Sequence, residues 1–261
     1  MNNIIKRFFY KENKKMSMRS SGRNIEISEN HTQKTFTING TIQSLVMKNS
    51  DYTMEYWDMF PPLAYVFENP RVLMIGLGGG TIAHQISANF GSRVQLEIFE
   101  VDANIADMSK RFFGLNPATK IVIGDGAVLL SKKRAAYDII ILDAYDVDTI
   151  PAQFLTAQFV RNASNALKGA GILAINYIST MRHGGMLENY VNILSEHFSV
   201  YLINARGITS NSIIICSKSL KKEEIVDKIR SSIGAGSYKS MIVSNYENME
   251  RGATEKHWDS R

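Results

Sequence analysis

The stretch "VLMIGLGGGTIAHQI" (residues 72–86) passes from a run of apolar residues directly into a loop that holds four glycines. The apolar run predicts a buried strand over residues 71–77, and the residues from 79 to 90 predict a helix. Glycine lets the backbone turn sharply there and lets a ligand approach without meeting a Cβ atom. Because a plain tight turn has the same pattern, this loop indicates a ligand site only together with other residues; its glycines are Gly76, Gly78, Gly79 and Gly80.

Further apolar strands alternate with helical stretches on the C-terminal side of this loop. Strands are predicted over residues 94–102, 120–125, 137–145, 171–178, 199–205 and 211–218, and helices over 103–114, 157–167, 184–198 and 221–233. Such alternation is typical of an α/β fold with a mostly parallel sheet and helices on both faces. Ligands in such folds bind at the carboxyl ends of the strands.

The N-terminal part has a different texture. Residues 24–30 and 34–47 alternate between apolar and polar, and the pair Asn39-Gly40 predicts a hairpin turn, since both residues tolerate positive φ. We therefore predict a basic, flexible terminus over residues 1–20, a small β domain over 21–66, a ligand-binding domain over 67–237 and a polar tail over 238–261. Residues 55–67 are aromatic-rich, and their two prolines limit any helix there.

Composition restricts the class of protein. The 261 residues, 44% of them hydrophobic, suffice for one substantial core. Much of the excess positive charge lies in residues 6–23, where a solvated terminus is favoured over contact with nucleic acid. The single cysteine, Cys216, sits in an apolar run and resembles a core thiol, which suits a reducing cytoplasm. No apolar stretch approaches the roughly 18 residues of a membrane span, and we expect a soluble, cytoplasmic protein with no signal peptide.

Acidic residues follow the second and third strands of the predicted sheet. Glu100 comes about 20 residues after the glycine loop, where a carboxylate can accept both hydroxyls of a ribose. Asp102 points to the other side of the strand and is the weaker candidate. Asp125 can accept from an adenine amino group, with Gly126 leaving space for the ring, or it can cap a helix. Together these residues are typical of proteins that bind S-adenosylmethionine or its relatives.

A second stretch, "IIILDAYDVDTIP" (residues 139–151), carries two carboxylates that can converge on a cation. Asp143 ends a strongly apolar strand and emerges beside the glycine loop, and Asp146 follows on the departing loop. An amine nucleophile is mostly protonated at neutral pH, so a neighbouring carboxylate can anchor its charge and accept its proton. An electrophilic carbon next to a sulfonium needs no acid catalysis, and positioning then supplies most of the rate. A turn with a helix cap is the alternative interpretation.

The order of "VLMIGLGGGT", "IFEVD", "GDG", "YDIIILDAYD" and "IPAQFLTAQF" resembles the spermidine synthase family, the polyamine aminopropyltransferases, over roughly residues 24–217. The resemblance implies a Rossmann-like class I methyltransferase fold, with a mostly parallel seven-stranded sheet and a small N-terminal β-hairpin domain. It also implies decarboxylated S-adenosylmethionine as co-substrate with no permanently bound cofactor, a polyamine such as putrescine as acceptor, and a homodimer or homotetramer. Neither nucleic acid nor a membrane is expected as a partner.

The resemblance also assigns roles to residues of this chain. It implies that Asp143 is the proton acceptor and that Asp146 and Tyr145 line the amine site. The Tyr145 ring can equally be packing. In "INGTIQ", Gln43 matches a ligand-contacting glutamine, and Tyr52 in "SDYTMEY" is taken as the substrate-binding tyrosine. A separate aromatic group is interpreted as core or as the wall of a cavity or dimer interface: Tyr56, Trp57 and Phe60.

The sequence departs from the family's pattern in the glycine loop. Members that make spermidine carry an aspartate where this chain has Gly79, and that aspartate helps hold the transferred amino group. The paired acidic residues before the family's tyrosine are also absent. Three hypotheses follow: an aminopropyltransferase, a methyltransferase that uses intact S-adenosylmethionine on a small molecule, and a non-catalytic nucleoside-binding protein. Fold alone does not choose among them.

Other polar residues give weaker signals. No Asn-Pro-Pro-Tyr type motif follows the fourth strand, which argues against methylation of nucleic-acid amino groups. Arg182 and His183 lie in a predicted loop that either edges the site or is plain surface. His84, His183 and His197 do not show the spacing of metal ligands, so we expect no metal.

Overall fold

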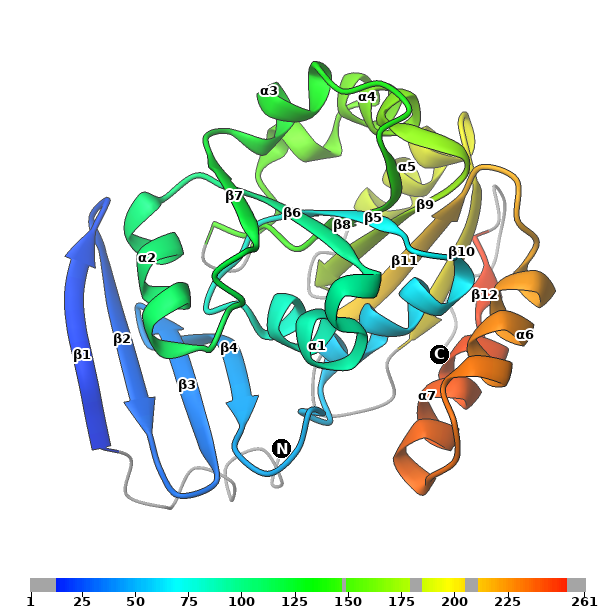
Figure 1. The fold of residues 1–261 in the computed structure, drawn as a ribbon. Coiled ribbons are helices and arrows are strands. Elements are labelled where there is room, and N and C mark those ends of the chain that lie inside the picture. The colour runs from blue at the N-terminus through cyan, green and yellow to red at the C-terminus, as the bar shows by residue number, and fades with distance from the viewer. Residues whose placement is uncertain (1–12, 147–148, 179–184, 205–210, 253–261) are drawn as a thin grey trace.

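A computed structural model describes residues 13–146, 149–178, 185–204 and 211–252 (Figure 1). Its larger sheet has eight strands in the described residues, in the order β12-β10-β11-β9-β8-β5-β6-β7; this is one more than the seven expected, because β12 adds to the edge at β10. The pairs β5–β6, β5–β8, β6–β7 and β8–β9 are parallel, and β10 pairs antiparallel with β11 and β12. The strands are β5 (Arg71–Ile75), β6 (Gln95–Glu100), β7 (Lys120–Ile123), β8 (Tyr137–Leu142), β9 (Leu167–Ile178), β10 (Ser199–Asn204), β11 (Asn211–Ser217) and β12 (Glu250–Arg251).

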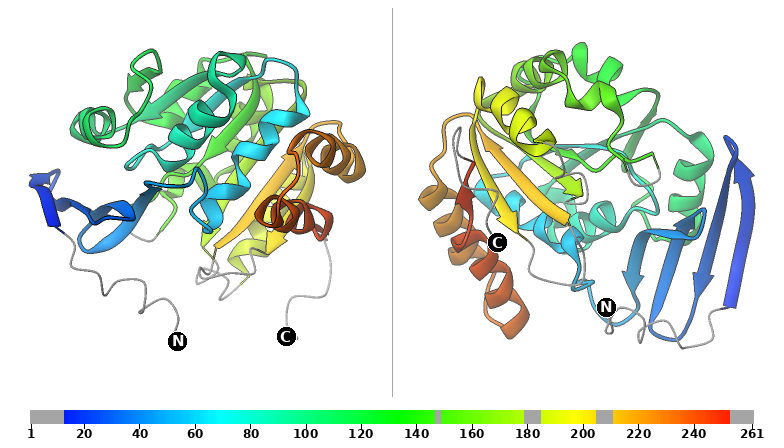
Figure 2. Two further views of the ribbon diagram at one scale, coloured as in Figure 1. Left: turned by 60° about the horizontal axis from the view of Figure 1, so that its bottom comes forward. Right: turned by 180° about the vertical axis from the view of Figure 1, so that it is seen from behind.

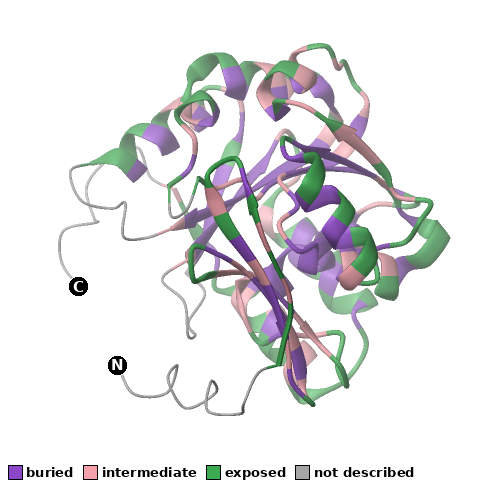
Figure 3. Cartoon of the chain, turned by 90° about the vertical axis from the view of Figure 1, so that its left-hand side faces the viewer, coloured by how far each residue is buried: buried purple, intermediate pink, exposed green. Residues whose placement is uncertain are grey.

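Helices cover both faces of this sheet, as the alternation in the sequence predicts (Figures 1 and 2). Successive strand residues point to opposite faces: Val72 and Met74 of β5 join one core cluster, while Leu73 and Ile75 join the other. The first cluster includes residues of α1 (Thr81–Phe90), α6 (Lys222–Ser232) and α7 (Ser237–Glu247). The second includes residues of α3 (Gly126–Ser131), α4 (Ala157–Ala166) and α5 (Met186–Ser195). Buried residues accordingly follow the strands, and exposed residues the outer helix faces (Figure 3).

A separate four-stranded antiparallel sheet precedes the larger one, in the order β1 (Asn13–Ser20), β2 (Arg23–Glu29), β3 (Gln33–Ile38) and β4 (Thr41–Met47). The Asn39-Gly40 hairpin is confirmed, with φ of 49° and 81° between β3 and β4. Apolar residues of this sheet pack on α2 (Ala103–Phe112), which leads away from β6. The β1 strand corrects the expectation of a flexible terminus up to residue 20, because residues 13–20 form a strand that pairs with β2.

Two short 3-10 helices, η2 (Tyr56–Met59) and η3 (Pro61–Val66), join the two sheets. Pro61 and Pro62 open η3, where the missing backbone N–H groups are not needed. Two more 3-10 turns are η4 (Gly91–Arg93) and η5 (Ala152–Leu155). The expectation of a polar tail from residue 238 is wrong up to residue 251, because α7 buries Ile242 and Tyr246 in the first core cluster and β12 pairs with β10.

Two composition-based expectations concern the core and the membrane. Cys216 is fully buried on β11, and burial raises the pKa of its thiol above the ordinary value. Among the described residues, none of the helices has the length and apolar character needed to cross a membrane.

Candidate active site

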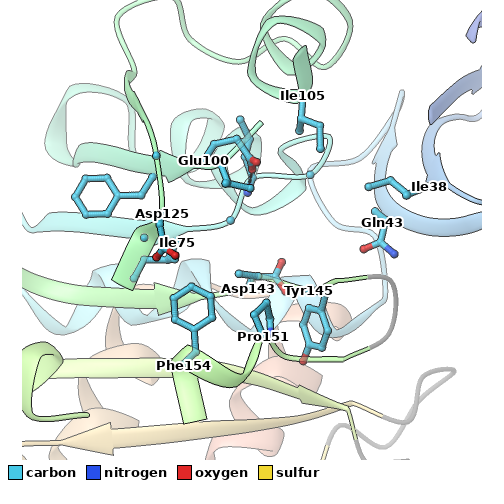
Figure 4. A pocket seen from close by; sticks show the side chains of 18 of the residues that line it. Ile38, Gln43, Ile75, Glu100, Ile105, Asp125, Asp143, Tyr145, Pro151 and Phe154 are labelled. Carbon is cyan, nitrogen blue, oxygen red and sulfur yellow. Dashed lines mark hydrogen bonds between the residues drawn. The ribbon is translucent and has the colours of Figure 1, made fainter. Parts of the chain in front are cut away.

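A cavity opens at the carboxyl ends of β5, β6 and β8, where parallel strands of an open α/β sheet present their ligands (Figure 4). The glycine loop, the ends of β6 and β8 and the N-terminus of α3 line it from the larger sheet. Arg23, Ile38 and Gln43 reach it from the N-terminal sheet, and Tyr56 reaches it from η2. The smaller sheet thus closes one side of a site that the larger sheet builds.

Gly76 and Gly78 have the backbone that the glycine loop needs. Their φ angles are +88° and +54°, a region that favours glycine. A Cβ atom on Gly76 would lie 2.3 Å from the backbone oxygen of Asp143 and would force the two loops apart. Both glycines line the cavity, as the sequence analysis expects of residues beside a ligand.

Gly79 and Gly80 lie behind the cavity and are not among the residues that line it. Gly80 has a φ of +91° and precedes the first turn of α1. A Cβ atom on Gly79 would lie 2.7 Å from Ser44 Cβ and 2.9 Å from Phe36 Cβ. The Gly79 backbone N–H also donates to Ser44 Oγ at 2.7 Å, so β4 is attached directly to the glycine loop. The space that a side chain at position 79 would need is therefore filled by the N-terminal sheet.

Glu100 ties the glycine loop to the end of β6. Its two carboxylate oxygens accept from the backbone N–H groups of Leu77 and Asp102, both at 2.9 Å. The side chain is 5% exposed, and burial raises the pKa of this carboxyl above its usual value despite these hydrogen bonds. Glu100 also lines the cavity, so its carboxylate is part of the cavity wall.

Asp102, the weaker candidate, has a different task. Its carboxylate caps α2 by accepting from Asn104 N, and it also accepts from Ser20 Oγ at 2.8 Å and from Arg23 at 3.2 Å. These contacts hold Arg23 at the edge of the cavity, where it is a cation that sequence reasoning missed. Only the packing of β2 against α2 brings that arginine to the site.

For Asp125, the structure shows the helix cap, one of the two alternatives that the sequence left open. Oδ1 caps α3 by accepting from Ala127 N at 2.7 Å and Val128 N at 3.3 Å, while Oδ2 lies 3.4 Å from Gln153 Nε2. Asp125 and Gly126 both line the cavity. A Cβ atom on Gly126 would lie 2.4 Å from Ile75 Cγ2, so this glycine also lets α3 pack closely on β5.

Asp143 faces the cavity from the end of β8 (Figure 4). Asn176 Nδ2 donates to its Oδ1 at 2.8 Å, and the Tyr56 side chain lies beside the same carboxylate. Burial nevertheless raises the pKa of Asp143 to about 6, since these two neighbours offset only part of the desolvation. A carboxylate with such a pKa is suited to accept a proton near neutral pH.

Asn176 is itself held by two partners. Asn211 Nδ2 donates to its side-chain oxygen at 2.7 Å, and the Tyr145 hydroxyl donates to its backbone oxygen at 2.5 Å. Tyr145 also lines the cavity together with Asp143. Its ring therefore forms part of the cavity wall, while its hydroxyl holds Asn176. The two asparagines come from β9 and β11, which pair antiparallel. Sequence reasoning missed them because no motif surrounds either one.

Three further candidates have mixed placements. Gln43 lines the cavity from β4. Asp146 is exposed in a turn where its backbone pairs with Thr149, and it is not among the lining residues. Tyr52 is also not a lining residue, because its ring packs against Tyr238 with centroids 4.8 Å apart.

Tyr56, for which the sequence left core, cavity wall or dimer interface open, lines the cavity beside Asp143, whereas Tyr52, taken as the substrate-binding tyrosine, does not. Both tyrosines follow the N-terminal sheet by a few residues, so spacing did not separate them; the η2 turn aims Tyr56 at Asp143. Burial and the nearby Asp143 carboxylate raise the pKa of Tyr56 well above its ordinary value, so it remains a hydrogen-bond donor. Arg182 and His183 lie outside the described residues. Within the described part of the chain, no group of three His, Cys, Asp or Glu side chains is placed to hold a metal.

Comparison with known proteins places this geometry in a family. The model of the spermine/spermidine synthase domain matches residues 58–228. The polyamine aminopropyltransferase of Vibrio vulnificus is 25% identical over 209 residues, which cover 76% of this chain and 68% of that protein. The spermine synthase of Arabidopsis thaliana is 30% identical over 144 residues, covering 52% of this chain and 40% of that protein.

A solved structure shows the same fold. The spermidine synthase from Thermotoga maritima superimposes with a TM-score of 0.64 at 20% identity, covering 88% of this chain and 87% of that one. This likeness supports the methyltransferase-like α/β fold with a preceding β sheet that the sequence predicts. Because the family model also spans well over half of the residues, the chain belongs to the spermine/spermidine synthase family.

Proposed function

We propose that this protein is an aminopropyltransferase, which moves an aminopropyl group from decarboxylated S-adenosylmethionine to an amino group of putrescine or a similar polyamine. The observation that carries the proposal is the Asp143 carboxylate. It faces the cavity beside the glycine loop, is held by Asn176, lies beside Tyr56, and has a pKa of about 6. Membership of the family supports the same reaction class, a transferase with no permanently bound cofactor.

In the proposed reaction, Asp143 binds the protonated amine and then accepts its proton. With a pKa of about 6, roughly nine-tenths of this carboxyl is ionised at pH 7. The neutral amine nitrogen attacks the donor carbon next to the sulfonium, a C–N bond forms and the C–S bond breaks. The electron pair of the C–S bond stays on sulfur, so methylthioadenosine leaves as a neutral thioether. The protein supplies position and a proton acceptor.

The nucleoside part of the donor would occupy the side of the cavity formed by β5, β6 and α3. Glu100 faces this side with lone pairs for the ribose hydroxyls, and Asp125 with an oxygen for the adenine amino group. Gly76 and Gly78 allow the sulfonium end to approach the backbone closely. Gln43, from β4, would contact the substrates from the opposite side.

One observation favours a second candidate, methyl transfer from intact S-adenosylmethionine to a small molecule. Position 79 has no carboxylate to hold a donor ammonium group, and Phe36 and Ser44 occupy the space of such a side chain. Asp146 is exposed and outside the cavity lining, which leaves Asp143 as the carboxylate at the reacting end of the site. An aminopropyltransferase with this site must hold the donor's amino group by other means.

The first experiment is calorimetric titration of the purified protein with S-adenosylmethionine, its decarboxylated form and methylthioadenosine, followed by product analysis with putrescine. Tighter binding of the decarboxylated donor, with release of methylthioadenosine and a longer polyamine, supports aminopropyl transfer. Preference for the intact donor with a methylated product replaces it by the second candidate. Binding without any turnover supports a nucleoside-binding protein instead.

Location and assembly are also proposals. The buried, unpaired thiol of Cys216 suits the cytoplasm, and a homodimer or homotetramer is the assembly that the resemblance in the sequence implies. Light scattering coupled to size-exclusion chromatography distinguishes both from a monomer of 29.3 kDa.

A further inference from the structure

The η2 turn has a catalytic side and a supporting side. Its first residue, Tyr56, lines the cavity together with Asp143 and lies beside that carboxylate. Its last two residues, Asp58 and Met59, are buried on the other side, at 1% and 3% exposure. The rigidity of Tyr56 therefore depends on what holds Asp58 and Met59.

Asp58 is a buried carboxylate surrounded by hydrogen-bond donors. It accepts from the backbone N–H and hydroxyl of Thr53, from Met54 N at 2.7 Å, from Gln85 Nε2 and from the Tyr238 hydroxyl. These donors come from the segment before η2, from α1 and from α7. One side chain thus connects the turn to two helices that do not line the cavity.

The C-terminal helix α7 supplies two of the hydroxyl groups that hold η2. Tyr238 donates to the Asp58 carboxylate, and Tyr246, about two helical turns later, donates to the backbone oxygen of Met59. Tyr246 is fully buried, and the ring of Tyr238 packs on Tyr52. Consecutive residues of the turn are therefore bound by one helix. That helix lies beyond residue 228, where the family match ends.

We propose that α7 is a positioning element for the reaction: through Tyr238 and Tyr246 it holds η2 so that Tyr56 stays beside the Asp143 carboxylate in the cavity wall. The role assigned to Asp143 rests on the proposed function, whereas the contact between α7 and η2 does not. Tyr238 and Tyr246 act only through Tyr56, since neither lines the cavity.

Loosening η2 should change the pH dependence of kcat/KM, whereas an ordinary loss of stability would not. The neighbouring Tyr56 side chain lowers the pKa of Asp143, so its displacement raises that pKa. The other groups near this carboxylate, Asn176 and Tyr145, are held by β9 and β11 and do not depend on α7. The acid limb of kcat/KM then moves to higher pH in a variant of α7, while methylthioadenosine binding is unchanged.

The variants are Tyr246→Phe and the milder Tyr238→Phe, each of which removes one hydroxyl and keeps the ring. The matched control is Tyr137→Phe. The Tyr137 hydroxyl is also buried and bonded to a carboxylate, that of Glu97, but it lies at the opposite end of β8 from Asp143. The Tyr137 hydroxyl binds Glu97 and not η2. Its variant therefore measures the general effect of losing a buried hydroxyl, apart from any effect on η2.

A second readout does not require activity. The chain has two tryptophans, and Trp57 lies in η2, 5% exposed, with its ring 4.6 Å from that of Tyr56. In a Trp258→Phe background, quenching of the remaining fluorescence by acrylamide reports the mobility of η2. If the wild-type chain shows no turnover, the proposed function fails, and this readout alone decides whether α7 holds the turn.

We expect Tyr246→Phe to raise the quenching constant of Trp57 about twofold and to move the acid limb up by about half a pH unit, the equivalent of about a threefold change in proton affinity. Tyr137→Phe should change neither. Should Tyr246→Phe fail to fold, Tyr238→Phe is expected to show the same two changes to a smaller extent. Folded variants with wild-type quenching and a wild-type acid limb would overturn the proposal.

Discussion

Replacement of Asp143 by asparagine should stabilise the protein while abolishing turnover. Burial raises the pKa of this carboxyl from 3.8 to about 6, so the folded protein binds a proton more tightly here than the unfolded chain does. Between these two pKa values the folded state holds more protons, and stability falls as the pH rises. At about 1.36 kcal/mol per pKa unit, the ionised carboxylate costs about 3 kcal/mol above pH 6.

Asparagine has nearly the same shape and carries no charge, and its oxygen can still accept from Asn176. The free energy of unfolding of Asp143→Asn should therefore rise relative to wild type by about 2 kcal/mol between about pH 4.5 and pH 7.5, most of the full 3 kcal/mol. The measurement is denaturation by urea of both proteins across this range, because other titrating groups cancel in their difference. A difference that stays constant with pH would refute the burial of a charged group at this position.

Three further outcomes are expected. The kcat/KM of the wild-type protein should fall about tenfold between pH 7 and pH 5, because a carboxyl with a pKa of about 6 is then mostly protonated; a flat profile would exclude Asp143 as the proton acceptor. Glu100→Ala should weaken methylthioadenosine binding, measured by calorimetry, and lower stability by about 2 kcal/mol or more, because two buried N–H groups lose their acceptor. Gly79→Asp should lower the melting temperature without improving turnover, because its Cβ would overlap Phe36; the usual cost is about 1–3 kcal/mol. A stable Gly79→Asp variant with faster turnover would contradict this expectation and show that the N-terminal sheet can move to admit the side chain.

The sequence predicted the architecture well because the architecture depends on hydrophobic periodicity and on a few residues that favour positive φ. Alternate residues of β5 enter opposite cores, which is what a continuous apolar run before a glycine loop implies. The Asn39-Gly40 turn and the positive φ of Gly76 are local properties of the residues themselves. The predicted polar tail was wrong because α7 has little apolar periodicity and owes its burial to contacts with distant elements.

The sequence by itself determined that Glu100, Asp125 and Asp143 gather at one edge, because each follows a parallel strand and such strands end side by side. Only the tertiary structure decided which tyrosine meets Asp143 and what fills the space at Gly79. These contacts join β4, η2 and α7 to the glycine loop and to β8 across long sequence separations. The physical reason is packing: the direction of a side chain from a turn is set by the neighbours that bury it, and no spacing along the chain encodes those neighbours.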